Sequence, residues 1–278
     1  MGNDRSDQLK SEVKEHWESE VCGTRFAEDE KQDEYFQTIE RTRYDAEPYI
    51  PGFAKFDTSN GKEVLEIGVG AGTDFIQWIR QHAKPTGIDM TSAAISITRE
   101  RLNRENVSED RYTLTQGDAE NLQFPDQSFD VVYSHGVLHH TPNTVKALQE
   151  VLRVLKPGGE ARIMVYGVPC WSGLMLWVRY ALLAGKITKS QKQVIFENLE
   201  SPGTKAYGNS EFSRIMEEIG YKGVKVEREL GSGDLLMMPP SEKFQGTLYR
   251  IVWALWPRWL IRKFGRPWGT ALICHAEK

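Results

Sequence analysis

Short apolar runs alternate with helix-like segments between residues 61 and 166 of the chain. In the helix-like segments the apolar residues recur every three or four positions, which is the spacing of one face of a helix. Strands are predicted over residues 64–68, 85–89, 112–116, 129–134 and 160–166. Helices are predicted over residues 73–82, 92–104 and 145–155. Strands that alternate with helices of this length are typical of a parallel sheet covered on both faces.

The N-terminal region differs from this middle part. It is strongly polar, and its few apolar residues have the spacing of a helix that packs on a larger domain. Pro48 and Pro51 are expected to stop that helix. The pattern therefore predicts an N-terminal helical segment over residues 1–50 and a single structural domain over residues 51–278.

Two insertions interrupt the alternation of strands and helices after residue 166. The first, at about 168–205, is largely apolar and precedes a predicted helix over 211–219. The second, at about 231–268, separates predicted strands over 223–230 and 269–275.

Composition narrows the class of protein. The 278 residues are 40% hydrophobic and 27% charged, as expected of a soluble globular protein with a sizeable core. The net charge of −4 offers no basic field, so nucleic acid is disfavoured as a partner. The polar N-terminus predicts no secretory signal, and no apolar run has the length of a membrane span. A cytoplasmic location is the resulting expectation.

The cysteines do not indicate a disulfide framework. Cys22, Cys170 and Cys274 are widely spaced and odd in number, which indicates free thiols in a reducing compartment. No cluster with metal-ligand spacing is visible, so no metal is expected.

A glycine-rich run, Glu66-Ile-Gly-Val-Gly-Ala-Gly-Thr73, lies between the first predicted strand and its helix. Glycines at such a turn let a ligand approach the backbone closely. The dinucleotide-binding pattern G-x-G-x-x-G fails here, because the last position is Thr73 when counted from Gly68 and Phe75 when counted from Gly70. A tight turn without a ligand is the alternative interpretation.

Two acidic residues follow the next two strands. Asp89 comes 21 residues after Gly68, where a carboxylate can accept hydrogen bonds from both hydroxyls of a ribose. Asp89 also lies where it could cap the helix that begins near Thr91. Asp118 follows the third strand, where it can meet an adenine edge or act as a turn residue.

Four runs in this order resemble one known family: EIGVGAG, GIDMT, GDAENLQFPDQSFDVVYSHGVLHH and LKPGGEARI. Over residues 60–166 the chain is similar to class I S-adenosylmethionine-dependent methyltransferases of the small-molecule branch, the methyltransferase type 11-like proteins. The resemblance implies an α/β fold with a doubly wound, Rossmann-like sheet of seven strands and an antiparallel last strand. Helical insertions would form a lid.

The resemblance also implies a cofactor, S-adenosylmethionine, which leaves as S-adenosylhomocysteine, and a set of residues that bind it. The methionine and ribose part would lie against the glycine-rich run, at Glu66, Gly68, Gly70, Gly72 and Thr73. Asp89 would bind the ribose hydroxyls, and Met90 would pack on the adenine ring. Asp118 and Ala119 would meet the adenine edge. Ser134 and His135 would lie beside the methionine part.

The N-terminal helical segment would cover the cofactor site, as it does in many such families. Arg41, Arg43 or Tyr44 could then meet the carboxylate of the cofactor. An ordinary solvated helix face is the alternative for these three side chains.

Methyl transfer from a sulfonium needs alignment of acceptor, methyl and sulfur more than it needs side-chain chemistry. A general base is required only if the acceptor loses a proton near the transition state. His139 and His140, just past the fourth strand, are the candidates, since histidine has a suitable pKa. Each could instead hydrogen-bond its own loop.

Both insertions are expected to lie above the carboxyl ends of the strands, where ligands bind in parallel sheets. Tryptophan, arginine and lysine residues alternate with apolar ones over 244–268, and no acidic residue interrupts them. This composition suits a membrane interface. We expect a small apolar or lipid-linked acceptor and peripheral contact with the inner face of a membrane. Burial of these segments in a lid or a dimer interface is the alternative.

Two other functions remain open at this point. One is a non-catalytic protein that binds S-adenosylmethionine for regulation, because a cofactor pocket does not prove turnover. The other is an NAD-dependent oxidoreductase on a similar fold, which the failed glycine pattern opposes.

Overall fold

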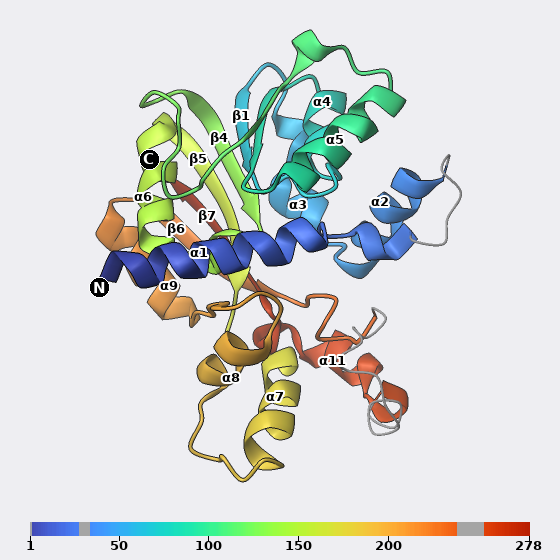
Figure 1. Cartoon of the computed structure of the whole chain (residues 1–278), viewed down its shortest axis with the longest axis vertical. Coiled ribbons are helices and arrows are strands. Elements are labelled where there is room, and N and C mark those ends of the chain that lie inside the picture. Colours follow the sequence, from blue (N-terminus) through green and yellow to red (C-terminus); the bar gives the residue numbers. More distant parts are fainter. Residues whose placement is uncertain (1, 28–33, 238–252) are drawn as a thin grey trace.

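The computed structural model describes residues 2–27, 34–237 and 253–278. Across these residues one seven-stranded sheet runs in the order β3-β2-β1-β4-β5-β7-β6, and β7 is antiparallel to both of its neighbours (Figure 1). The strands are β1 Glu63–Ile67, β2 Lys84–Asp89, β3 Thr113–Gln116, β4 Phe129–His135, β5 Leu155–Tyr166, β6 Lys222–Glu229 and β7 Ala271–Glu277. The predicted doubly wound sheet with an antiparallel last strand is confirmed.

Helices cover both faces of the sheet (Figure 1). One face is covered by α3 Ile50–Ala54, α4 Phe75–Arg80 and α5 Ser92–Arg104, whose apolar residues share a core with β1 and β4. The other face is covered by α6 Thr144–Val154 and α9 Asn209–Ile219. The side chain of Asn143 accepts a hydrogen bond from Lys146 N at the start of α6, and Gly220 ends α9 in a left-handed conformation.

The N-terminal region forms α1 Gly2–Ser19 and α2 Tyr35–Ala46. Pro51 was predicted to stop a helix, but it lies in the first turn of α3 instead. A proline fits there because the first amides of a helix have no partner within it.

Strand β5 begins at Leu155, five residues before its predicted start at Glu160. The run Lys156-Pro-Gly-Gly159 follows the end of α6, and proline and glycine usually interrupt regular structure. Its backbone instead pairs with the end of the chain, since Gly158 N donates to Lys278 O and Lys278 N donates to Gly159 O. Long-range pairing overrides the local preference here.

The first insertion contains α7 Trp171–Trp177, a π-helical turn η5 Val178–Leu182 and α8 Gln191–Asn198. The second insertion contains α11 Arg258–Phe264. Helices α7, α8 and α11 lie together on the same side of the sheet, in one lobe of the molecule (Figure 1). The earlier residues of the second insertion, Phe244, Leu248, Tyr249, Arg250 and Ile251, lie outside the described residues. Short 3-10 turns are η1 Thr24–Ala27, η2 Phe56–Thr58, η3 Glu109–Arg111, η4 Leu138–His140 and η7 Arg266–Trp268.

None of the described helices has both the length and the apolar character needed to cross a membrane.

Candidate active site

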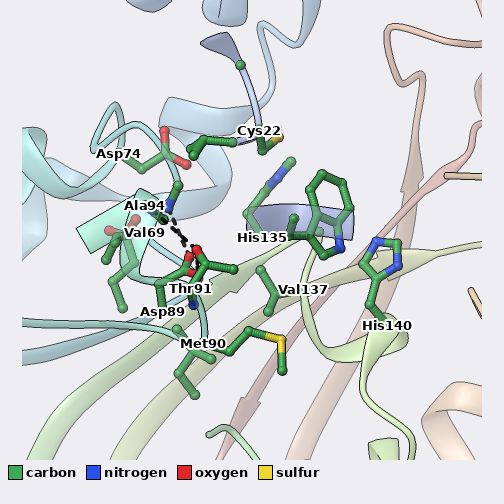
Figure 2. A pocket seen from close by; sticks show the side chains of 18 of the residues that line it. Cys22, Val69, Asp74, Asp89, Met90, Thr91, Ala94, His135, Val137 and His140 are labelled. Carbon is green, nitrogen blue, oxygen red and sulfur yellow. Dashed lines mark hydrogen bonds between the residues drawn. The ribbon is translucent and has the colours of Figure 1, made fainter. Parts of the chain in front are cut away.

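A cavity of about 260 Å³ lies at the carboxyl ends of β1, β2, β4 and β5. Crossovers put loops at this edge of a parallel sheet, so ligands usually bind there. Helix α1 contributes Lys10, Val13 and Trp17 to its wall, and Figure 1 shows α1 running across the molecule at this edge. In Figure 2, Asp89 and Met90 lie at one end of the pocket, His140 lies at the other, and Val137 lies between them.

The glycine-rich turn after β1 requires glycine at Gly68. Its φ of +85° is in the left-handed region, and a Cβ atom there would lie 2.1 Å from Cγ2 of Val137. Any side chain would therefore strain the backbone and collide with the wall of the pocket. The absence of side chains leaves the backbone of this turn open to a ligand.

Asp89 sits at the end of β2 with its carboxylate held in place. Oδ1 accepts hydrogen bonds from Thr91 N (3.0 Å) and Thr91 Oγ1 (2.8 Å), and Oδ2 accepts one from Gly70 N (3.2 Å). The cap of α5 is Thr91, whose hydroxyl accepts from Ala94 N, so Asp89 does not serve as the helix cap. Its carboxylate lines the pocket with lone pairs to spare, which suits the proposed ribose hydroxyls.

Asp118, after β3, is tied to α1. Lys10 Nζ donates to Asp118 Oδ2 at 2.8 Å and to Glu120 Oε2 at 2.9 Å. Burial lowers the pKa of Lys10, but hydrogen bonds to the two carboxylates outweigh it, so the pKa lies above its ordinary value. Asp118 also forms the turn that sequence allowed, since its Oδ1 accepts from Glu120 N.

Glu66 is a buried carboxylate that faces the pocket from β1. Trp78 Nε1 donates to its Oε2 at 2.6 Å. Burial raises the pKa of Glu66 well above its ordinary value, and the nearby Asp74 adds to the effect. A bound ammonium group would stabilise the ionised form, so this position fits the amino group of a methionine moiety.

Arg43 and Tyr44 of α2 both bind Asp74, directly after the glycine-rich run. Arg43 Nη2 donates to Asp74 Oδ2 at 2.6 Å, and the hydroxyls of Tyr44 and Tyr133 donate to the same carboxylate. Burial raises the pKa of Asp74 but the Arg43 guanidinium outweighs it, and the pKa ends below its ordinary value. This buried network anchors α2 to the turn and leaves Arg43 in the pocket wall.

The structure brings most of the predicted cofactor residues to this wall. Those that line it are Glu66, Gly68, Gly70, Thr73, Asp89, Met90, Asp118, Ala119 and His135. Gly72 lies outside the lining and faces Thr98 of α5. Ser134 is fully buried, and its hydroxyl donates to Ile67 O at 3.2 Å between β4 and β1. The assignment of all these residues to cofactor binding stays a prediction.

His139 and His140 are both buried, but only His140 lines the pocket. His139 is inaccessible, does not line the pocket, and makes no hydrogen bond from either ring nitrogen within the described residues. Its ring packs 4.0 Å from the ring of Tyr166, centroid to centroid. Burial and the neighbouring His140 lower the pKa of His139 well below its ordinary value. The structure therefore offers His139 no route to an acceptor.

His140 lines the pocket, and its Nδ1 is held by two hydroxyls, Ser201 at 2.8 Å and Thr204 at 3.1 Å. The Thr204 hydroxyl donates its own proton to Ser201 O, so its oxygen can only accept from Nδ1. This assigns the proton to Nδ1 and leaves the lone pair on Nε2. Nε2 is itself buried, and within the described residues it has no hydrogen-bond partner.

Glu200 and Tyr166 complete this end of the pocket. The Tyr166 hydroxyl donates to Glu200 at 2.8 Å, and Glu200 Oε2 lies 3.4 Å from His140 Nε2. Burial raises the pKa of Glu200, but a protonated His140 ring and the Tyr166 hydroxyl would outweigh it, so the pKa of this carboxyl lies below its ordinary value. A carboxylate there stabilises a positive charge on the imidazole.

Sequence reasoning missed several residues of the wall. Trp17, Glu47, Glu200 and Ser232 come from segments far apart in the chain. Glu200 follows α8 in a turn with φ of +53°, which no pattern marks as functional. Asp74 is a missed residue with a usable signal, since it directly follows the glycine-rich run.

Cys22 also lines the pocket with a side chain that reaches solvent, and desolvation by the pocket wall raises the pKa of its thiol to about 11. The thiol is therefore protonated at neutral pH. All three cysteines are free, as predicted. The described residues contain no group of three or more side chains placed to hold a metal ion.

Comparison with known proteins agrees with this geometry. A family profile described as "Methyltransferase domain" matches residues 65–163. The chain is 30% identical over 172 residues to demethylmenaquinone methyltransferase of Tropheryma whipplei, covering 60% of this chain and 70% of that protein. It therefore belongs to the S-adenosylmethionine-dependent methyltransferases, and the cofactor expected from the sequence is the one that this family uses. Family membership also sets the NAD-dependent alternative aside.

Two further similar proteins differ in how much of each chain the similarity covers. Phosphoethanolamine N-methyltransferase 2 of Caenorhabditis elegans is 38% identical over 112 residues, which is 40% of this chain. The chain spans only 25% of that relative's length, and 36% and 49% of two other curated relatives. The putative methyltransferase solved with the Haloferax volcanii Trm112 activator has the same fold, with a TM-score of 0.63 and 16% identity over 95% of this chain and 96% of that one.

Proposed function

We propose that this chain transfers a methyl group from S-adenosylmethionine to a small acceptor with an apolar body and a protic group. The observation that carries the proposal is one continuous pocket with two unlike ends. Asp89 and the glycine turn lie at one end, and His140 with its lone pair lies at the other.

The cofactor end would hold S-adenosylmethionine through groups already in place. Asp89 would bind the ribose hydroxyls, Glu66 the amino group, and Arg43 the carboxylate. When bound, the cofactor supplies an electrophilic methyl group on sulfur. Helix α1, tied to this end by Lys10, would cover the cofactor and exclude water.

The acceptor end would orient and deprotonate the acceptor. Nε2 of His140 would take the proton of a hydroxyl or amine as the acceptor atom attacks the methyl carbon. Glu200 would stabilise the imidazolium that forms, and Ser201 and Thr204 would hold the ring. The pocket is also lined by apolar side chains that would suit an apolar body: Val13, Trp17, Val21, Ile39, Ala46, Val137, Pro142 and Met164.

Demethylmenaquinone, which the name of the Tropheryma whipplei relative gives as its acceptor, is consistent with an apolar body. A second candidate is a cationic amine, which the carboxylates of Glu47 and Glu200 favour because both face the pocket. The phosphoethanolamine relative methylates nitrogen, as its name says. Burial raises the pKa of Glu47, however, which reduces its negative charge and weakens the case for a cation.

The test uses methyl-labelled S-adenosylmethionine with an extract of the native host, separated into organic and aqueous fractions after reaction. Label that enters the organic fraction with wild-type protein, and not with His140→Gln, supports the proposal. Label confined to the aqueous fraction overturns the apolar acceptor and favours the amine. Cofactor that binds without any transfer supports the non-catalytic, regulatory alternative.

A further inference from the structure

Exposed apolar side chains are concentrated in the two insertions. Among the described residues, Val145 is the only large apolar side chain exposed elsewhere. The others, all between residues 182 and 268, are Leu182, Leu183, Ile187, Phe196, Met237, Trp253, Leu255, Trp259, Leu260, Phe264 and Trp268. Clustering of this kind on a folded protein marks a surface that contacts something apolar.

Helix α11 presents several of these exposed side chains. Ile261 is its one buried residue, whereas Trp259 is 71% exposed and Phe264 63% exposed. Leu255, just before the helix, is 77% exposed. We define the α11 surface as Leu255, Trp259, Leu260, Arg262, Lys263 and Phe264.

The α11 surface is fixed to the rest of the protein. Trp171 at the start of α7 donates from Nε1 to Gly265 O at 3.0 Å, and its ring lies 5.6 Å from that of Trp268. The buried carboxylate of Asp234 accepts hydrogen bonds from Ser172 Oγ and Thr270 N, which joins α7 to the start of β7. The exposed side chains therefore project from a braced element rather than from a loose loop.

The charge of the α11 surface is wholly positive. Residues 253–268 contain arginines and a lysine and no acidic residue. In the described part of the chain, Arg258, Arg262 and Lys263 form no ion pair, whereas Arg266 pairs with Glu227 and Glu229. Arg258 lies 4.4 Å from the ring centre of Trp253 and makes a cation–π contact with it.

We propose that the α11 surface docks on an anionic membrane. Tryptophan, leucine and phenylalanine side chains bury at the boundary between headgroups and acyl chains, and arginine and lysine pair with anionic headgroups. A second copy of this chain fits poorly, because a symmetric contact would bring Arg262 and Lys263 against the same cations of the other copy.

Docking would also place the pocket beside the bilayer. Ser232 lines the pocket, and Met237, five residues later, accepts a hydrogen bond from Arg262 Nη2 through its sulfur at 3.7 Å. Five residues span at most about 18 Å, so the pocket wall lies close to the α11 surface. The docking proposal itself does not depend on which acceptor the enzyme uses.

The test is co-sedimentation of the full chain with vesicles. Binding is expected to phosphatidylcholine vesicles that contain phosphatidylglycerol, and not to phosphatidylcholine alone, and added salt should weaken it. Because each cation contributes about fivefold near an anionic surface, Arg262→Glu should weaken binding at least about fivefold. The double variant Arg262→Glu/Lys263→Glu should weaken it at least about 25-fold. Trp259→Ala/Phe264→Ala should abolish the shift of tryptophan fluorescence on binding.

Arg214→Glu is the matched control, because Arg214 is an exposed cation on α9, away from the α11 surface. It should bind vesicles like the wild type. All variants should keep the wild-type melting temperature, since the substituted side chains are exposed. Absence of binding to anionic vesicles at low salt, or equal loss in Arg262→Glu and Arg214→Glu, would overturn the proposal. So would a wild-type dimer in sedimentation velocity that Trp259→Ala/Phe264→Ala dissociates, because the surface would then belong to a second copy.

Discussion

Asp89 and His140 lie at opposite ends of one pocket, but the chain builds their surroundings in different ways. The end around Asp89 is formed mainly by residues 66–91 and 117–119. Its glycine-rich turn presents backbone atoms, rather than side chains, to the pocket. The end around His140 combines side chains as far apart in the sequence as Trp17 and Glu200. Backbone recognition of a fixed cofactor needs a local motif, whereas recognition of an acceptor depends on which distant segments pack together.

The sharpest test of this contrast substitutes each of the two adjacent histidines in turn. His140→Gln removes the proposed base, so kcat should fall about 100- to 10,000-fold, the usual contribution of general base catalysis. His139→Leu is the matched control, because His139 is sealed off from the pocket. Its kcat should stay close to wild type in the same methyl-transfer assay.

Equal losses in the two variants would mean that the pair acts through packing, and a kcat of wild-type size in His140→Gln would remove the base from the mechanism.

The cofactor end can be tested by Asp89→Ala. Loss of two hydrogen bonds that the ribose hydroxyls would donate to this charged carboxylate, at about 1.5 kcal/mol each, should weaken S-adenosylmethionine binding about 100-fold. Titration calorimetry measures this directly. Asp118→Ala should have a smaller effect, because Lys10 already holds that carboxylate. An affinity in Asp89→Ala equal to that of the wild type would contradict the ribose assignment.

The smallest expected effect concerns stability. Burial holds the pKa of His139 well below its ordinary value, so the folded chain keeps it neutral while the unfolded chain takes up a proton below about pH 6.5. The unfolded state then binds more protons, so stability falls as the pH is lowered from that value. The loss is about 1.4 kcal/mol per pH unit, or about 2 kcal/mol by pH 5.

Urea unfolding of wild type and His139→Leu at pH 7 and pH 5 isolates this contribution. Burial also lowers the pKa values of His135 to about 3 and of His275 to about 4, but both histidines are present in both proteins. The wild type should therefore lose about 2 kcal/mol more than the variant. Identical losses would show that His139 takes up a proton in the folded state.

The sheet, and the residues that line the Asp89 end of the pocket, could be predicted from the sequence because their signals are local. Helix α5 has the bounds that were predicted, and β1, β2 and β4 lie within a residue or two of their predicted ends. Strand β5 began early because pairing with the C-terminus overrode the preference of Pro157 for a turn. Nothing local marks Pro51 as the start of a helix rather than the end of one.

The acceptor end could not be read in the same way. His139 and His140 are adjacent in one 3-10 turn, and which of them meets the pocket depends on α1, β5 and the first insertion. Glu200 has no motif around it, and only the fold brings it within 3.4 Å of His140. The aromatic and basic composition of 244–268 was visible, but its exposure on α11 was not.

The most direct test of the central claim is calorimetric titration of the wild-type chain with S-adenosylmethionine, followed by competition with S-adenosylhomocysteine. We predict one binding site per chain, displaced by S-adenosylhomocysteine and insensitive to NAD. A chain that binds NAD, or that does not bind S-adenosylmethionine at all, would contradict the assignment of this pocket.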